Sequence, residues 1–340
     1  METVKKIYSL LGDETSKYIF ENRLLYSLTE DKKFVRNVVC TIDKGREIYE
    51  QMRSNTGNIG IFGAGDVGRH LIHVYDDLKF SCFIDNKKAG IMYHGLPVIS
   101  LKEFMQRCPD GIIIISTKLY YKEIMEQLLE EGIKKENIIN LGMEYKKLNH
   151  LQYFDLPQLK KRRRMEEIFV DGGGYDGMTS VEFMKWHGNA GGGYAHTYTW
   201  EPDLDNIEKC KKALDECGMD YELVPKGLWS NAKKLKLKTD DTASSISKDG
   251  DISIEVDSID NVINRQVTFI KMDIEGAEYQ ALLGAKNMIA AYKPKLAICV
   301  YHKPEDIWEL PLLIYEMNSD YKFFLRHYSF ADNETVLYAL

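Results

Sequence analysis

The feature that most constrains the fold of this chain is the glycine-rich stretch 168–177. It reads Ile-Phe-Val-Asp-Gly-Gly-Gly-Tyr-Asp-Gly, an apolar run that leads into consecutive glycines. The apolar run predicts a short buried strand, and Asp176 can cap the helix that follows. Because Gly172, Gly173 and Gly174 lack a Cβ atom, the backbone can turn sharply there and a ligand can lie directly on it. A strand, a glycine turn and a helix N-terminus form a nucleotide-type site in an open α/β sheet.

Acidic residues end this strand and the next one. Asp171 comes before the glycines, at the strand end, so we do not interpret the turn as that of a dinucleotide-binding protein, in which the acidic residue lies about 20 residues further on. Residues 197–202 predict the next strand, which ends at Glu201, and a carboxylate there can accept both hydroxyls of a ribose. This arrangement resembles the class I S-adenosylmethionine (SAM) methyltransferases. An ordinary glycine turn in an α/β protein is the alternative.

Length and composition bound the class of protein. A chain of 340 residues favours two domains, and 44% hydrophobic with 29% charged residues is ordinary for a globular protein. The net charge of −7 gives no general attraction to nucleic acid or to anionic membranes. We find neither a signal peptide nor a membrane-spanning run, and the six cysteines form no C-x-x-C pair. These features predict a cytoplasmic protein with reduced thiols.

A second strand, glycine turn and helix lie in the first half of the chain. The turn residues Gly63, Gly65 and Gly68 fit G-x-G-x-x-G, and Asp85 ends the following strand at a suitable distance for a ribose. Strands and helices then alternate, which predicts a parallel sheet, with residues 95–98 in a loop. This half resembles the small Rossmann-like domains of bacterial sugar-modifying enzymes. A dinucleotide, a nucleotide-sugar or a purely structural role all remain open for the turn.

The most specific stretch follows a predicted strand at residues 267–273. Residues 273–278 read Asp-Ile-Glu-Gly-Ala-Glu, and residues 281–285 read Ala-Leu-Leu-Gly-Ala. Together with the strand and loop at 294–306, this pattern closely resembles the FkbM family of SAM-dependent O-methyltransferases. The resemblance covers about residues 168–340. It implies a class I methyltransferase domain with a mixed seven-stranded sheet, preceded by the smaller Rossmann-like βαβ domain.

The predicted organisation has three parts. These are a helical lead segment at residues 1–55, a Rossmann-like domain at 56–150 and a methyltransferase domain at 151–340. We expect strands at 322–328 and 334–339 to form an antiparallel edge hairpin. Residues 231–256 predict a further hairpin or flap with a serine-rich tip near the mouth of the site.

The resemblance implies SAM-dependent O-methylation of a sugar or glycan precursor. The residues expected to bind SAM lie at or after strand ends, and they are Asp171, Gly172, Gly173, Gly174, Asp176, Glu201, Trp229, Ser230 and Asp273. Trp229 and Ser230 would flank the adenine, although a core position is an equal alternative for the tryptophan.

Asp273 and His302 are the predicted catalytic residues. His302 follows the fifth strand of the domain, and a neutral imidazole with an ordinary pKa of about 6.5 can take the proton of the acceptor. The predicted substrate-binding residues are Glu275, Glu278, Arg326 and His327.

A metal ion is a further expectation at the same turn. Asp273, Glu275 and Glu278 offer hard oxygen ligands that suit Mg²⁺. Negative charge is also favoured in the first turn of a helix by about 0.3–1 kcal/mol, which alone could account for Glu275 and Glu278. Two other functions stay open: a non-catalytic module that binds SAM or a nucleotide-sugar, and a bifunctional enzyme with an NAD-binding N-terminal domain.

Overall fold

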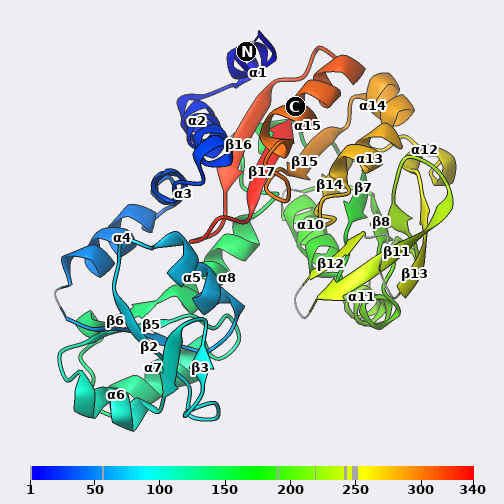
Figure 1. The fold of residues 1–340 in the computed structure, drawn as a ribbon. Coiled ribbons are helices and arrows are strands. Elements are labelled where there is room, and N and C mark those ends of the chain that lie inside the picture. Colours follow the sequence, from blue (N-terminus) through cyan, green and yellow to red (C-terminus); the bar gives the residue numbers. More distant parts are fainter. Residues whose placement is uncertain (1, 56, 190, 219, 241–242, 247–251) are drawn as a thin grey trace. The chain divides into compact units, whose positions relative to one another are not determined.

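A computed structural model describes residues 2–55, 57–189, 191–218, 220–240, 243–246 and 252–340, and its fold is drawn in Figure 1. The chain divides into two compact units, neither of which is continuous in sequence. Unit 1 comprises Met1–Phe20, Gln152–Arg326 and Glu334–Leu340. Unit 2 comprises Glu21–Leu151 and His327–Asn333. The segment His327–Asn333 joins the last two strands of unit 1, yet it belongs to unit 2.

Unit 2 is built on a six-stranded sheet with the order β3-β4-β2-β1-β5-β6. Its strands are β1 Ile59–Phe62, β2 Phe80–Ile84, β3 Met92–Tyr93, β4 Leu96–Ile99, β5 Ile112–Ile115 and β6 Ile138–Asn140. All neighbouring strands are parallel except β3 and β4. The strands β1 and β5 are completely buried, as their uninterrupted apolar sequences require in a parallel sheet covered on both faces.

The helices of unit 2 alternate with these strands. They are α3 Lys33–Val39, α4 Gly45–Ser54, α5 Asp66–Val74, α6 Leu101–Arg107, α7 Tyr121–Glu130 and α8 Leu141–Leu151, with a short η1 at Lys135–Asn137. The predicted loop at 95–98 is wrong, because Leu96–Ile99 forms β4. His94 and Gly95 have φ values of +44° and +81° and make the tight two-residue turn that pairs β3 with β4.

Unit 1 is built on a seven-stranded sheet with the order β16-β17-β15-β14-β7-β8-β9. The strands are β7 Glu167–Gly172, β8 Ala195–Trp200, β9 Tyr221–Val224, β14 Phe269–Met272, β15 Lys295–Cys299, β16 Phe323–His327 and β17 Thr335–Ala339. Strands β7, β8, β9, β14 and β15 are parallel, whereas β17 is antiparallel to β15. The predicted mixed seven-stranded sheet is therefore confirmed.

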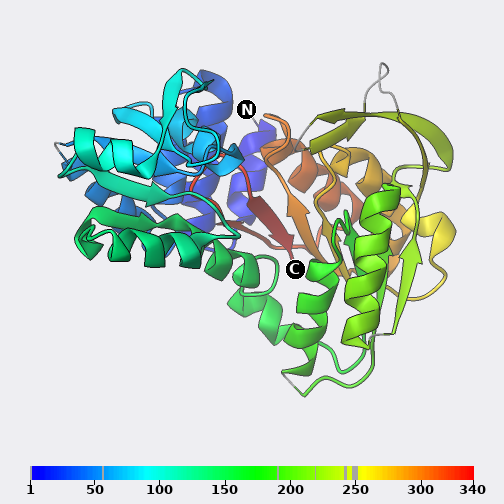
Figure 2. The same ribbon diagram turned by 90° about the horizontal axis from the view of Figure 1, so that it is seen from below.

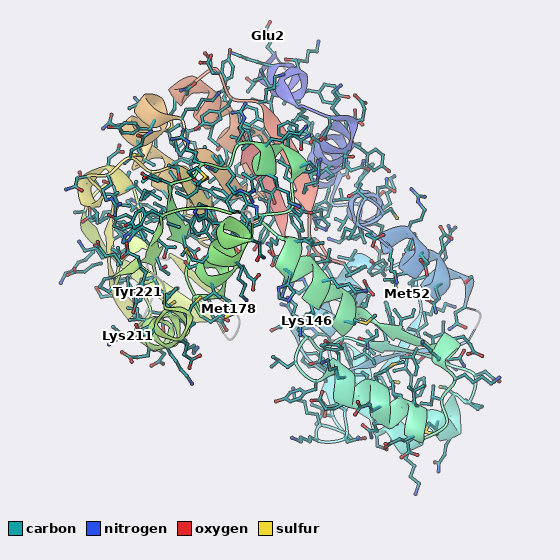
Figure 3. The ribbon with its side chains drawn as sticks, turned by 180° about the vertical axis from the view of Figure 1, so that it is seen from behind. Glu2, Met52, Lys146, Met178, Lys211 and Tyr221 are labelled. Atoms are coloured by element: carbon teal, nitrogen blue, oxygen red, sulfur yellow. The ribbon has the colours of Figure 1, made fainter. Side chains whose placement is uncertain are left out.

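The helices of unit 1 lie on both faces of this sheet. They are α1 Glu2–Leu10, α9 Pro157–Lys161, α10 Met178–Gly188, α11 Leu204–Cys217, α12 Ile259–Val262, α13 Glu278–Leu283, α14 Lys286–Tyr292 and α15 Asp306–Met317. Figure 2 shows α10 and α11 on one face and α13, α14 and α15 on the other. Figure 3 labels Met178 at the start of α10 and Lys211 in α11, two helices that pack together. Helix α2 spans Glu14–Thr29 and contributes residues to both units.

Aromatic side chains fill the core between the sheet and α10. Phe169 of β7 stacks on Phe183 of α10, with ring centroids 4.3 Å apart, and Phe269 of β14 packs beside them. All three side chains are fully buried. Burying a phenylalanine contributes roughly 1.5–3 kcal/mol, so this cluster anchors the two strands whose ends carry the glycine turn and Asp273.

A smaller sheet with the order β10-β13-β11-β12 is inserted before β14. Its strands are β10 Gly227–Leu228, β11 Lys233–Asp240, β12 Ala243–Ile246 and β13 Ile252–Asp257. Strand β11 pairs antiparallel with both β12 and β13, as expected for a flap. Thr242 at its serine-rich tip, like residues 247–251 of the predicted segment, lies outside the described residues. No helix in the part of the chain that the structure describes is both long and apolar enough to cross a membrane.

Candidate active site

The glycine turn after β7 is tightly packed. Gly173 has a φ of +81°, and an added Cβ atom would lie 2.0 Å from the carbonyl oxygen of Asp273. A Cβ atom on either Gly172 or Gly174 would lie 2.5 Å from a neighbouring side chain. The turn therefore needs glycine for its own close packing, and contact of these residues with a ligand stays a prediction.

Asp171 does not face an open site. Its side chain is completely buried, with Oδ1 lying 3.0 Å from the ammonium nitrogen of Lys271. Its Oδ2 accepts a hydrogen bond from Ser180 of α10 at 2.8 Å. Burial opposes the charge on Lys271, but the carboxylates of Asp171 and Asp273 outweigh it and raise the pKa of the lysine. Lys271 is therefore a buried cation, and Asp171 is its counter-ion.

Glu201 lies directly after β8 and is also buried. Its two oxygens accept the backbone N–H groups of Tyr175 and Asp203 at 2.8 and 2.9 Å. Burial raises the pKa of Glu201 above its ordinary value. Because each carboxylate oxygen has two lone pairs, Glu201 can still accept the hydroxyls of a ribose. Asp176 accepts the N–H of Met178, the first residue of α10, at 3.1 Å, but the N-cap residue of that helix is Gly177.

Trp229 and Ser230 follow β10 in the small inserted sheet rather than the third strand of the main sheet. Both are half-buried. The backbone N–H of Trp229 donates a hydrogen bond to the carbonyl oxygen of Asp257 at 2.8 Å. The ammonium of Lys233 lies 4.6 Å from the centre of the indole ring. An adenine contact at Trp229 stays a prediction.

Asp273 follows β14, the strand next to β7. Tyr153 and Tyr301 donate hydrogen bonds to its two oxygens at 3.0 and 3.1 Å. Burial favours the neutral acid, but the nearby charges of Lys271 and His302 outweigh it and lower the pKa of Asp273. Its side chain is 24% exposed, so an ionised carboxylate faces outward at this strand end.

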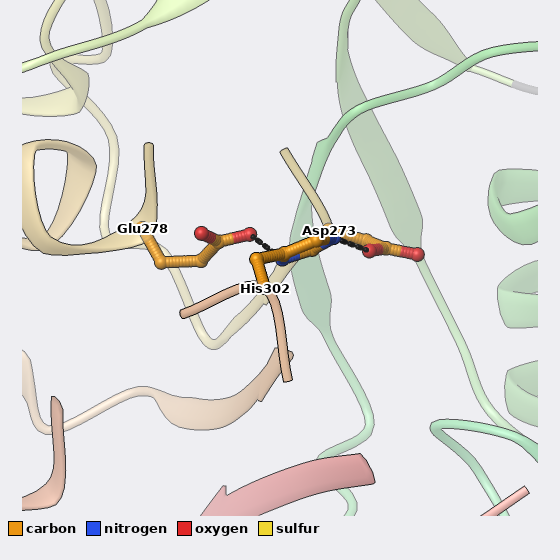
Figure 4. A group of neighbouring side chains, drawn as sticks. All are labelled: Asp273, Glu278 and His302. Carbon is orange, nitrogen blue, oxygen red and sulfur yellow. Dashed lines mark ion pairs between the residues drawn. The ribbon is translucent and has the colours of Figure 1, made fainter. Parts of the chain in front are cut away.

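His302 lies between two carboxylates, as Figure 4 shows. Its Nδ1 is 3.0 Å from Oε1 of Glu278, the first residue of α13. Its Nε2 is 3.5 Å from Asp273 and 3.5 Å from Glu275. Glu278 is completely buried and also accepts the backbone N–H of Ile274 at 2.9 Å. A buried carboxylate thus lies next to Nδ1 of the imidazole, and the other ring nitrogen, Nε2, faces Asp273 and Glu275.

The charges around His302 change its titration. Burial lowers the pKa of the imidazole, but pairing with Glu278 and the charges of Asp273 and Glu275 together raise it to about 9. The expectation of an imidazole with an ordinary pKa is therefore wrong. His302 is protonated at neutral pH in the ligand-free protein, and it is a stronger base once the proton has left.

The same group could hold a metal ion. Asp273, Glu278 and His302 each offer one ligand atom, and these atoms lie within 4.8 Å of one another. Mg²⁺ prefers six oxygen ligands, whereas this set supplies two carboxylates and one nitrogen that already pairs with them. The Mg²⁺ expectation stays a prediction.

Arg326 and His327 lie in surroundings of their own. Arg326 pairs with Asp13 at 2.7 Å and donates to Ser16 at 3.2 Å. His327 is buried, its Nε2 lies 2.9 Å from the carbonyl oxygen of Ala331, and burial lowers its pKa to about 3. Both residues end β16, and two strands, β17 and β15, separate β16 from β14 in the sheet. Their predicted substrate contacts stay predictions.

The second glycine turn lies in unit 2, after β1. Gly63 has a φ of +109°, and a Cβ atom on Gly68 would lie 2.7 Å from a core phenylalanine, whereas one on Gly65 would meet open space. Asp85 accepts the backbone N–H groups of Lys87 and Lys88 at 2.9 and 3.1 Å. The turn and the acid are thus used by the fold itself, and a nucleotide at this place stays a prediction.

Three residues of the site were not given these roles by sequence reasoning. From the sequence alone Lys271 is at most a minor candidate base, because a lysine is a slower base than histidine unless its pKa falls, and Tyr153 and Tyr301 carry no such signal. A lysine inside the apolar strand Phe269–Met272 was the available signal, since a buried charge requires a partner.

The strand order, with β17 antiparallel and an acid-bearing glycine turn after the central strand, defines a class I methyltransferase fold. Residues 171–330 match the family described as the methyltransferase FkbM domain. The chain therefore carries an FkbM methyltransferase domain, as the sequence resemblance predicted. Residues 55–139 match a second family, described as C2185-like, N-terminal.

One solved structure shares the fold of this chain. It is described as methyltransferase FkbM from Methylobacillus flagellatus KT, is 21% identical, and aligns over 86% of this chain and 93% of that protein with a TM-score of 0.54. A structure described as a SAM-dependent methyltransferase from Aquifex aeolicus is 15% identical over 58% of this chain and 96% of that protein, with a TM-score of 0.33. No curated protein matches the chain.

Proposed function

We propose that this protein is a SAM-dependent O-methyltransferase. The observation that carries the proposal is the Glu278–His302 pair beside Asp273. A buried carboxylate holds one ring nitrogen at 3.0 Å, and the other nitrogen points toward the ends of β14 and β15. A base whose orientation is fixed by a second group is the arrangement that removes a proton from a hydroxyl during attack.

The residues at the strand ends fit the cofactor. Glu201 would hold the ribose, Trp229 and Ser230 the adenine, and the glycine turn the methionine end. When bound, SAM supplies an electrophilic methyl group on a sulfonium. The ionised and partly exposed carboxylate of Asp273 suits a cationic group of this kind.

His302 would take the proton of the acceptor hydroxyl through Nε2. With a pKa of about 9, roughly 1% of the imidazole is neutral at pH 7. That fraction is a stronger base than an ordinary histidine, and Glu278 compensates the positive charge that forms on the ring. Asp273, which lies 3.5 Å from the same nitrogen, would orient the hydroxyl.

The charge of the cluster favours a neutral acceptor. Asp273, Glu275 and Glu278 outnumber the one imidazolium among them, and Glu275 is 46% exposed. An acceptor with a phosphate or carboxylate next to the reacting oxygen would be repelled. A neutral sugar or glycan hydroxyl fits this field, which supports the substrate class that the family resemblance implies.

The test is the His302→Ala variant. We expect it to lower methyl transfer by at least about 100-fold, the usual contribution of a general base, and to leave the affinity for SAM within twofold. Transfer would be followed with labelled SAM and the methyl glycosides of rhamnose, fucose, mannose and galactose. SAM binding would be measured by calorimetry.

His196→Ala is the matched control. His196 is likewise 8% exposed and pairs with Asp220 at 3.1 Å, but it lies at the opposite end of the sheet, near the start of β8. Undiminished transfer by His302→Ala would contradict the role of the base. SAM binding without transfer to any of the four glycosides would contradict the acceptor class and favour a non-catalytic module.

A further inference from the structure

We propose that Lys271 and Asp171 are positioning residues, which fix the backbone of the glycine turn from beneath and do not touch the cofactor. The expected effect of these two residues on SAM binding and methyl transfer rests on the proposed function. The geometry points to it because the ammonium of Lys271 lies within hydrogen-bond distance of Asp171 Oδ1, Gly172 O and Gly173 O, at 3.0, 3.0 and 2.8 Å. Two of the three ammonium donors go to the carbonyl oxygens, and the contact with Asp171 is an ion pair.

Both peptide units of the turn are held by hydrogen bonds through their carbonyl groups and through their N–H groups. The carbonyl groups of Gly172 and Gly173 accept from Lys271. The N–H groups of Gly173 and Gly174 donate to the carbonyl oxygen of Trp200 at 3.1 and 2.9 Å. The turn therefore presents a fixed shape to a ligand, rather than free N–H donors. Without the ammonium, the carbonyl group of Gly173 would lose this partner and that of Gly172 would keep only the N–H of Asp273 at 3.1 Å, so the peptide units could rotate.

Asp171 extends this support to other elements. Its Oδ2 accepts from Ser180 of α10, and the hydroxyl of Ser180 shares a hydrogen bond of 2.9 Å with Thr199 of β8. The parallel register places Lys271 of β14 directly opposite Asp171 of β7. One buried network thus joins the turn to three strands, β7, β8 and β14, and to helix α10. Because the carboxylate of Asp171 is completely buried, its effect on a ligand has to pass through the turn.

A second buried pair offers a matched control. Lys295 of β15 lies 2.8 Å from both oxygens of Glu167, the first residue of β7. The two lysines are 3% and 5% exposed, and both carboxylates are completely buried. The pairs therefore have similar burial in the same sheet. They differ in position, since Glu167 starts the strand β7 and Asp171 comes near its end, beside the turn.

The experiment compares Lys271→Met with Lys295→Met. Each variant removes one ammonium and leaves a buried carboxylate, so both should lower the midpoint of thermal unfolding to a similar degree. Lys271→Met alone should weaken SAM binding, measured by calorimetry, by at least about tenfold. In the ligand-free protein, it alone should also speed the hydrogen exchange of the Gly173 and Gly174 amides by at least about tenfold.

Each result decides the inference. Equal losses of SAM affinity in the two variants would overturn it, because the effect would then be a general loss of stability. Unchanged amide exchange in Lys271→Met would overturn it as well. If wild-type protein does not bind SAM, the proposed function fails, whereas amide exchange still decides the positioning role. If Lys271→Met does not fold, Lys271→Gln, which keeps two donors, is compared in the same way.

Discussion

The two glycine turns of this protein share a local structure and differ in what lies beneath them. Each follows a central strand of its sheet, β7 in unit 1 and β1 in unit 2, at the point where the strand order reverses. Both turns have the glycine spacing of the dinucleotide pattern, because Gly172, Gly174 and Gly177 are spaced like Gly63, Gly65 and Gly68, yet only the turn at 172–177 lies within the residues that match the methyltransferase domain. The glycine pattern therefore indicates how closely a helix packs on a strand, and it does not by itself identify the function of the turn.

The neighbouring strand carries the difference. In unit 1 a buried ammonium supports the turn, and Asp273 ends the adjacent strand β14. In unit 2 the hydroxyl of Ser116, after the adjacent strand β5, donates to the carbonyl groups of Phe62 and Gly63 at 3.0 and 3.2 Å. The adjacent strand thus supplies a charged donor, Lys271, to the turn in one unit, and the residue after it supplies a neutral donor, Ser116, in the other. We conclude that the residues in and after the adjacent strand are more informative than the glycines.

The largest difference should come from adding a methyl group to each turn. Gly173→Ala forces a Cβ atom to 2.0 Å from a backbone oxygen at positive φ, and we expect a loss of about 3 kcal/mol or more in the free energy of unfolding. Gly65→Ala places its Cβ atom in open space and should cost less than about 0.5 kcal/mol. Urea unfolding of both variants measures this. Similar losses would remove the proposed contrast between the turns.

The next effect concerns the charged cluster of Asp273, Glu278 and His302 in unit 1. In wild-type protein the kcat/KM of methyl transfer should rise about tenfold per pH unit and level off above about pH 9, since neutral His302 is the active form. Glu278→Gln removes the carboxylate that pairs with Nδ1, so the midpoint should move to lower pH. The plateau should fall by about 10- to 100-fold. A midpoint that does not move would show that Glu278 does not raise the pKa of the catalytic base.

The same pair should make stability depend on pH. The pKa of His302 is raised from about 6.5 to about 9, so its contribution is complete below pH 6.5 and is lost as the pH rises through 9. The full contribution is about 3 kcal/mol by that difference. Glu278→Gln should flatten this part of the stability profile, measured by urea unfolding between pH 6 and 10. An unchanged profile would mean that other groups dominate it.

A smaller contrast is expected between the two serines that support the turns. Ser180→Ala leaves one oxygen of the buried Asp171 carboxylate without its donor, which should cost about 1–3 kcal/mol. Ser116→Ala removes a donor from two neutral carbonyl groups and should cost about 1 kcal/mol. Thermal unfolding of the two variants gives the order. A larger loss for Ser116→Ala would reverse the comparison.

The smallest effect is expected from NAD. Asp85 already accepts two backbone N–H groups of its own loop, and Lys88 donates to the carbonyl oxygen of Ala64 within the turn at 2.8 Å. Calorimetric titration of wild-type protein should therefore show no saturable binding below about 1 mM. Tight binding of NAD would revive the bifunctional alternative and show that the two turns share a function.

Local patterns predicted the strands and the acids at their ends, because hydrophobic periodicity and glycine turns are local properties. Asp273 and His302 were found in this way. The supporting residues could not be found, since their roles depend on which strands become neighbours. Nothing local to Lys271 shows that Asp171 lies opposite it in the register. The pairing of Arg326 with Asp13, more than 300 residues away in the chain, was hidden for the same reason, and its substrate contact stays a prediction.

The segment His327–Asn333 limits how this gene can be divided. It begins with the last residue of β16 and leads toward β17, and it is part of unit 2. There the buried ring of Phe330 packs on Tyr145, and Asp332 accepts a hydrogen bond from Arg23. A fragment that began at residue 152 would carry this segment without those surroundings and would expose an aromatic side chain. The two units are therefore not independent modules that recombination could exchange by a single crossover.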